Sequence, residues 1–377
     1  MIKMKNMKPD EEYYLYFQKT RNIQDSTLRT YKIAVGEYCQ YNQSTIHELL
    51  MEAEQEEEQG IRWKHRTLKK RLLEYRAYLY NTHASSTAQT RFTRLKAFYK
   101  HFDIEIHRLP PITNNTPIPQ NKISDLPTKE ELRQVLKICK PVMVPLILFM
   151  TSSGCAKAET LSLTIDSYIN STKKYHNSNN IYEVIETLQE IENVVPTWEI
   201  LRHKTHKYYT TFNSPEATQA INVYLLSRKD HLKPTSPLFR IHETYLVDTF
   251  TKLNNALNMG KSGTYNKLRS HNLRKWHAST LKNDGMSMDL INDLQGKSKT
   301  IVDEAYFYND KEYLLDEYIK HLPALTINAD VQKITVKSRE FLELENKNRD
   351  LEDNMKNILY RMDQLEQLNW EEAKKEY

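Results

Sequence analysis

Apolar side chains recur at steps of three and four residues along most of the first hundred positions, the spacing of one face of an α-helix. This pattern predicts five helices, over residues 10–20, 28–38, 46–59, 64–80 and 88–101. Short polar side chains at 25–27 and 85–87 suit the N-terminal caps of the second and fifth helices. We therefore expect residues 1–108 to form a small all-helical domain.

A proline-rich stretch follows this domain, and we assign residues 109–125 to a linker. Four prolines stand between positions 110 and 119, and proline cannot continue a helix. The extended backbone that prolines favour makes a semi-rigid spacer. Such a spacer would let two domains close around a body as thick as a DNA duplex, although a simple domain boundary would have the same sequence.

The next region, residues 126–327, is expected to form a second, mainly helical domain with a small antiparallel sheet. Thr128 and Glu131 make a capping box at its start, and residues 142–151 form an apolar helix. Alternating β-branched and aromatic positions predict strands at 183–188 and 197–201, with the second continuing into a hairpin up to 212. Further helices are predicted to start at 214, 243 and 270.

The last segment, residues 328–377, carries a seven-residue repeat. Apolar residues stand at Leu344, Leu351, Ile358 and Leu365, and the alternate column holds Asn348, Met355 and Met362. This spacing predicts a coiled-coil-like helix that associates with itself or with a neighbouring molecule. A single exposed helix that packs within the same chain is the alternative.

Charge is distributed unevenly along the chain. The net charge of +5 is small for 377 residues, but an acidic run at 51–58 precedes a basic stretch with interleaved aromatic residues. Basic residues of two helices are therefore candidates for contacts with a DNA backbone, and a solvated helix face is the equally weighted alternative. The candidates are Arg62, Lys64, Arg66, Lys69, Lys70, Arg91, Arg94 and Lys96.

Cysteine content and hydropathy exclude several classes of protein. The three cysteines lack the CxxC spacing of a zinc site and are too few for a disulfide framework. No apolar run is long enough to span a membrane, and the first nine residues lack an apolar signal core. We expect a soluble, cytoplasmic protein with no cofactor, no metal and no membrane partner.

Candidate chemistry is concentrated between residues 270 and 308. His271 and Arg274 are three residues apart in a predicted helix, so a base and a fixed cation face the same volume. Tyr306 follows about thirty residues later and would supply a phenolic nucleophile. Tyr308 and Tyr313 are alternative nucleophiles. A phenol has a pKa of about 10 and needs a base during attack, while cations stabilise a phosphorane.

These residues resemble the C-terminal motifs of the tyrosine recombinases. The similarity rests on His271-x-x-Arg274, then on residues 294–298 (Leu-Gln-Gly-Lys-Ser), and then on residues 304–307 (Glu-Ala-Tyr-Phe). The residue types at 304–307 and at 318–326 are most similar to those of the archaeal integrases. The resemblance implies a two-domain clamp with a core DNA-binding domain at 1–108 and a catalytic domain at 126–327.

The resemblance also implies roles for three lysines. Lys157 stands where related sequences have their first catalytic arginine, and an ammonium cannot bind two phosphate oxygens through a rigid fork. Lys297 stands nine residues before Tyr306, where the family usually has His or Trp. Lys204, on the predicted hairpin, is implied as the lysine that protonates the departing 5′-hydroxyl, with Lys207 as its competitor.

We therefore expect a recombinase or integrase that cleaves and rejoins double-stranded DNA through a 3′-phosphotyrosine intermediate. Its setting would be a mobile element of archaeal or viral type. It would act as a tetramer on DNA, with accessory DNA-bending proteins as further candidate partners. A DNA-binding relative that has lost cleavage through Lys157 and Lys297 is the first alternative, and a non-catalytic coiled-coil adaptor is the second.

Overall fold

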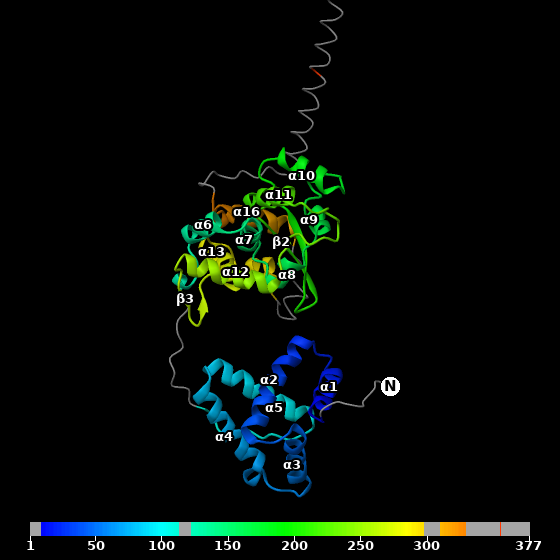
Figure 1. The fold of residues 1–377 in the computed structure, drawn as a ribbon, viewed down its shortest axis with the longest axis vertical. Helices are drawn as coiled ribbons and strands as arrows, with labels where there is room; N and C mark the ends of the chain where they lie inside the picture. Colours follow the sequence, from blue (N-terminus) through cyan, green and yellow to red (C-terminus); the bar gives the residue numbers. More distant parts are fainter. Residues whose placement is uncertain (1–8, 113–121, 298–309, 329–354, 356–377) are drawn as a thin grey trace, which may run out of the picture. The chain divides into compact units, whose positions relative to one another are not determined.

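The structure is a computed structural model that describes residues 9–112, 122–297, 310–328 and 355. The chain divides into two units, residues 1–119 and 120–377 (Figure 1). Tyr306, Tyr308 and the predicted coiled-coil tail lie outside the described residues, apart from Asn328 and the isolated Met355. Within the described part of the chain, no helix combines the length and apolar character needed to cross a membrane.

The first unit is all-helical in its described part. Its elements are α1 (Pro9–Arg21), α2 (Asp25–Asn42), α3 (Ile46–Glu58), a single 3-10 turn η1 (Trp63–His65), α4 (Thr67–Thr82) and α5 (Ser85–His101). Its core is rich in aromatic side chains, with Phe17, Tyr38, Tyr75 and Phe98 all buried. The five predicted helices are therefore present, each within a few residues of its expected bounds.

Two of the predicted helix caps are wrong. The N-cap of α2 is Gln24 and that of α5 is Ala84, and neither side chain accepts a capping hydrogen bond. Residues 25–27 and 85–87 lie inside the first turns of these helices instead. By contrast, Thr45 and Glu48 form a reciprocal capping box at the start of α3.

The second unit is a helical body with two small antiparallel hairpins. It begins with η2 (Ile123–Asp125), α6 (Lys129–Ile138), α7 (Met143–Ser153), α8 (Lys157–Ser162), α9 (Ile165–Ser171) and α10 (Ile181–Gln189). The hairpins are β1 (Thr197–Arg202) with β2 (Lys207–Phe212), and β3 (Lys261–Ser262) with β4 (Tyr265–Asn266). The remaining helices are α11 (Pro215–Ser227), α12 (Glu243–Ala256), α13 (Ser270–Asn283), α14 (Met288–Leu294) and α16 (Lys311–Leu325).

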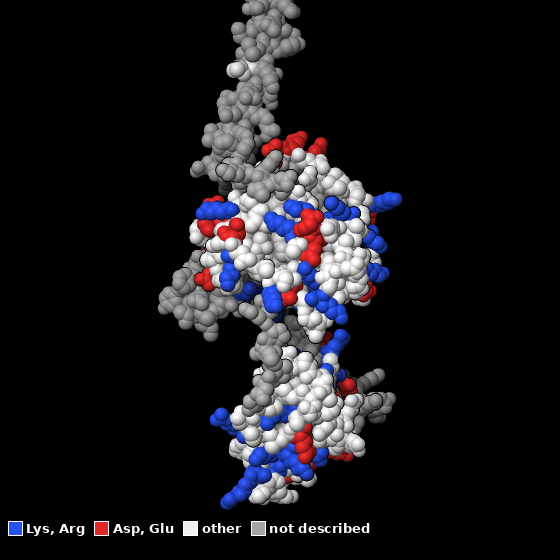
Figure 2. Space-filling view, turned by 90° about the vertical axis from the view of Figure 1, so that its left-hand side faces the viewer, with Lys and Arg blue, Asp and Glu red and all other residues white. Residues whose placement is uncertain are grey.

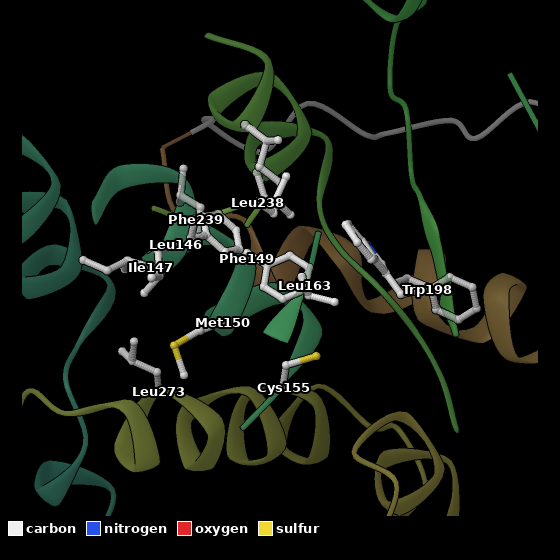
Figure 3. Close-up of a cluster of buried hydrophobic side chains, with 14 of the residues drawn as sticks. Leu146, Ile147, Phe149, Met150, Cys155, Leu163, Trp198, Leu238, Phe239 and Leu273 are labelled. Carbon is white, nitrogen blue, oxygen red and sulfur yellow. The ribbon is translucent and has the colours of Figure 1, made fainter. Parts of the chain in front are cut away.

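The helix α7 lies at the centre of the second core. All of its residues except Val144 are buried, as its nearly continuous apolar sequence predicts. Figure 3 shows Leu146 and Phe149 beside Phe239, while Met150 points towards the helix that carries Leu273. The α7 helix also packs on α11 and α16. This central helix therefore holds the elements that carry the candidate site.

The prediction of a strand at 183–188 is wrong, because these residues belong to α10. Its buried residues are Ile181, Val184, Ile185 and Leu188, at steps of three, one and three. That is one face of a helix, and Asn180 caps its start by accepting a hydrogen bond from the backbone N–H of Tyr182 at 3.0 Å. The strand predicted from residue 197 and its hairpin are confirmed, with Thr197 opposite Phe212 and Arg202 opposite Lys207.

Candidate active site

Arg274 lies in the first half of α13, with 8% of its surface exposed. Its guanidinium donates hydrogen bonds to two backbone carbonyl oxygens, that of Gly154 at 2.7 Å and that of Gln295 at 2.5 Å. The carboxylate of Glu159 lies 3.6 Å from the same guanidinium. A buried charge needs such partners because it has lost water. Segments far apart in the sequence therefore fix this one cation.

The turn at Gly154 is built for close packing. Gly154 ends α7 with a φ of +67°, a conformation that favours glycine. A Cβ at this position would lie 2.6 Å from Nδ1 of His277. Burial lowers the pKa of His277 to about 3, and Nδ1 lies 3.2 Å from the side-chain nitrogen of Gln295. His277 is therefore a neutral, buried residue that supports the packing of the site.

Glu159 lies in the first turn of α8, and its carboxylate organises the other side of the site. It accepts hydrogen bonds from the backbone N–H of Ala156 at 2.8 Å and from the hydroxyl of Tyr209, on β2, at 2.9 Å. Burial raises the pKa of Tyr209, and nearby Cys155 and Glu159 raise it further. The Tyr209 phenol therefore stays protonated and donates, which holds the Glu159 carboxylate beside Arg274.

The turn after α14 supplies the third side. Gln295 donates its side-chain N–H to the backbone carbonyl of Arg274 at 2.9 Å, so the two residues are bonded in both directions. Gly296 follows with a φ of +56°, and a Cβ there would lie 2.4 Å from the ring of Tyr209. The turn is thus pressed against β2, and it is followed directly by Lys297.

Lys297 shares this basic surface. Partial burial lowers the pKa of its ammonium, and the positive charges of Arg274 and Arg202 lower it further. Of the predicted site residues, Lys297 and Arg274 therefore lie near enough for their charges to interact. Their mutual repulsion is unfavourable unless an anion lies between them.

His271 stands one helical turn before Arg274 and is exposed. Partial burial of its ring lowers its pKa below the usual 6.5, and Lys275, Arg269 and Arg274 act in the same direction. At neutral pH the imidazole is therefore uncharged and can accept a proton. This state suits the general base that the sequence motif implies.

One of the expected lysines is engaged elsewhere. Lys157 begins α8 and forms an ion pair with Glu243, at the start of α12, with a separation of 2.6 Å. Its charge is engaged there, whereas Glu159 is the carboxylate beside Arg274. Lys204 lies in the exposed turn between β1 and β2. Tyr306 lies outside the described residues, so the structure describes the basic half of the predicted site and not its nucleophile.

Sequence reasoning missed three residues that the structure places in this cluster. Arg202, at the end of β1, donates hydrogen bonds to the carbonyl oxygens of Gln295 and Gly296. Glu159 is not among the site residues predicted from the sequence. Gln295 contributes mainly its backbone carbonyl oxygen as a hydrogen-bond acceptor, and no sequence pattern predicts such a role. Across the residues described, no group of three or more His, Cys, Asp or Glu side chains is placed to hold a metal ion.

The predicted DNA-binding residues of the first unit fall into two groups. Arg66 and Arg91 are engaged in ion pairs, with Glu57 at 2.5 Å and with Glu37 respectively. These two guanidiniums therefore connect helices. The others are Arg62, Lys64 and Lys70, which are exposed, and Lys69, Arg94 and Lys96, which are half-buried.

A surface groove of the first unit is lined by further cations. Lys96 lies over the ring of Phe92 and lines the groove together with Arg76, Lys100 and Arg108. Figure 2 shows Lys and Arg side chains gathered on the visible face of this unit, with fewer acidic ones among them. Arg76 and Arg108 were not predicted, because they are distant in sequence from Lys96 and only the fold brings them to one groove.

No model of a protein family matches this sequence, and no curated protein matches it. The comparison with solved structures does find similar chains. The XerH site-specific recombinase, bound to a palindromic difH substrate after cleavage, is 15% identical over 81% of this chain and 83% of that one, with a TM-score of 0.51. The Tn1549 transposon integrase, in complex with transposon right-end DNA, is 16% identical over 81% of this chain and 97% of that one, with a TM-score of 0.47.

The XerH similarity establishes the fold at this low identity. The chain has a mainly helical fold with small antiparallel sheets, similar to that of the XerH site-specific recombinase. The predicted fold class is confirmed to this extent.

Proposed function

We propose that this protein is a site-specific DNA recombinase or integrase that cleaves and rejoins double-stranded DNA through Tyr306. The observation that carries the proposal is the cluster of Arg274, Lys297 and Arg202. Glu159 is the one carboxylate of the described residues within ion-pairing distance of these three cations. Such a surplus of positive charge suits a phosphodiester, whose charge grows as phosphorus becomes pentavalent.

In the proposed reaction, the phenolic oxygen of Tyr306 forms a bond to phosphorus while the bond from phosphorus to the 5′-oxygen breaks. His271 takes the phenolic proton, and Lys204 gives a proton to the departing 5′-oxygen, which leaves as a 5′-hydroxyl. The product is a 3′-phosphotyrosine ester. A second 5′-hydroxyl reverses these steps and restores the phenol, so no external energy source is consumed.

Several finer expectations belong to the same proposal. Strand exchange between two duplexes would require four copies of the chain, with the tail as a candidate for their association. The basic groove of the first unit would contact the DNA backbone. Within this proposal, the archaeal integrases are the branch with the most similar motif residues, and a mobile element is the setting.

A binding protein that no longer cleaves DNA is the second candidate. It is favoured by one observation, the ion pair between Lys157 and Glu243, which engages the cation expected at the first arginine position. In that case the protein would bind a specific duplex without forming a covalent bond to it.

The test begins with duplexes that the full chain selects from a pool of randomised sequences. A nick near the selected site traps the covalent product, because the short released strand diffuses away. We expect a covalent adduct with the wild-type chain and none with Tyr306→Phe, while Tyr308→Phe and Tyr313→Phe retain it. Selective binding without an adduct would support the second candidate, and no selection of DNA at low salt would contradict both.

A further inference from the structure

Two guanidiniums in the second unit donate hydrogen bonds to the same backbone oxygen. Arg274 of α13 donates to the carbonyl oxygen of Gln295 at 2.5 Å, and Arg202 of β1 donates to the same oxygen at 2.9 Å. Arg202 also donates to the carbonyl of Gly296. Two like charges are therefore held next to each other by one turn of the chain.

The local charge balance of this pair is positive. Among the described residues, Glu159 lies near Arg274 but no carboxylate is within ion-pairing distance of Arg202. Lys297 adds a third positive charge, and both arginines act on its ammonium. Like charges this close are unfavourable in a partly buried place unless an anion joins them.

The geometry of Arg202 leaves it able to contact such an anion. Both of its hydrogen bonds to the turn use one nitrogen, Nη1. The other guanidinium nitrogens have no hydrogen-bond partner within the part of the chain that is described. The side chain is half-buried, and the turn fixes its position. A planar guanidinium held in this way suits two oxygens of a phosphate.

We propose that Arg202 is the second phosphate-binding guanidinium of this site and contacts the scissile phosphodiester together with Arg274. This inference rests on the proposed function and adds to it a residue that the sequence motifs do not contain. It also explains how the site can work while Lys157 is paired with Glu243. Arg202, on the hairpin, would supply the guanidinium that is missing at position 157.

The test compares Arg202→Ala and Arg202→Lys with the wild-type chain on a nicked duplex. A second duplex carries a methylphosphonate in place of the scissile phosphate, which removes one negative oxygen. On the ordinary phosphate we expect Arg202→Ala to slow adduct formation about a hundredfold or more, the typical loss of one donor to a developing negative charge. Arg202→Lys should recover only part of this rate. On the methylphosphonate the loss should shrink to less than about tenfold, because that charge is absent.

The control is Arg240→Ala, which removes an exposed guanidinium from the same unit. It should change neither rate. Equal losses for Arg202→Ala on both duplexes, together with a lower melting temperature, would assign Arg202 only to holding the turn and would overturn the inference. A wild-type rate for Arg202→Ala on the phosphate would also overturn it.

A separate measurement keeps the inference distinct from the proposed function. Inorganic phosphate, compared with chloride at matched ionic strength, should raise the melting temperature of the wild-type chain and of Tyr306→Phe, and should raise that of Arg202→Ala less. If the wild-type chain forms no adduct, the cleavage proposal fails while this comparison still decides whether Arg202 binds a phosphate. Equal shifts of the melting temperature in all three proteins would contradict the phosphate-binding role of Arg202.

Discussion

Arg274 illustrates how a single buried cation couples the candidate site to the fold. Its carbonyl partners at Gly154 and Gln295 are 120 and 21 positions away in the sequence. Each contact replaces water that the guanidinium has lost, so the ends of α7 and α14 must both be in place for the charge to be tolerated. The same contacts fix the direction in which Arg274 faces. Orientation of the charge and stability of the unit are therefore set by the same bonds.

His271 gives a prediction about pH. Because partial burial and three neighbouring cations lower its pKa below 6.5, the imidazole stays neutral, and able to act as a base, at lower pH than an ordinary histidine. We expect the rate of adduct formation to be highest near neutral pH and to fall as the pH is lowered and His271 becomes protonated, with the midpoint of the fall below the 6.5 of an ordinary histidine. The measurement is a pH profile of single-turnover adduct formation on the nicked duplex.

The comparison variants are His271→Gln and His231→Gln. The first should be slower throughout and lose the decline attributed to His271, whereas exposed His231 should have no influence on the profile. A decline whose midpoint lies above pH 6.5, or that persists unchanged in His271→Gln, would assign the proton to another group.

The sequence could predict only part of this site. His271 and Arg274 were accessible because they lie three positions apart in one helix, where local spacing determines which side chains share a face. Arg202 and Gln295 were not accessible, because one is paired through backbone carbonyls 93 and 94 positions away and the other acts as such a carbonyl. Every residue type carries that group, so no pattern of side chains identifies it.

At the scale of elements, short apolar segments were the ones that sequence patterns misassigned. Residues 183–188 include β-branched side chains and were assigned to a strand, but Val184, Ile185 and Leu188 already stand at the spacing of a helical face, which Ile181 extends. Long periodic segments such as α7 and α13 were predicted within a few residues. The caps of α2 and α5 failed because several polar residues stand in a row, and their order alone does not determine which one precedes the first helical turn.

The turn after α14 gives a prediction at this scale. Gly296→Ala places a Cβ both at a φ of +56° and against the ring of Tyr209, so the turn must shift. Gly263→Ala is a matched control, since its φ is +61° and no atom lies within 4 Å of the added Cβ. We expect Gly263→Ala to lower the free energy of unfolding by about 1–2 kcal/mol, the cost of the left-handed conformation alone.

Gly296→Ala should lower the free energy of unfolding further than its control does. It should also reduce adduct formation, because the carbonyl shared by Arg202 and Arg274 would move with the turn. Chemical denaturation and the adduct assay measure the two effects. Equal destabilisation by both variants with no loss of adduct would mean that the exact position of this turn does not matter for the site.

At the scale of the whole molecule, the described residues form two hydrophobic clusters with no member in common. One belongs to the helices of the first unit, and the other surrounds α7 in the second (Figure 1). Each unit therefore has a core that can be lost without exposing the other core. The basic groove and the Arg274 cluster lie in different units, so each feature depends mainly on the core beneath it.

Because the two cores share no residue, we expect calorimetry of the full chain to show two unfolding transitions. Leu72 and Leu146 are both fully buried, one in each core. Truncating either to alanine should cost about 2–5 kcal/mol, and we expect each variant to shift a different transition to lower temperature. Above the transition lowered by Leu72→Ala, the phosphate-dependent stabilisation assigned to Arg202 should persist, because α7, α13 and α14 remain folded. A single transition that both variants lower equally would show instead that the two cores unfold as one cooperative unit, and the site would then depend on both.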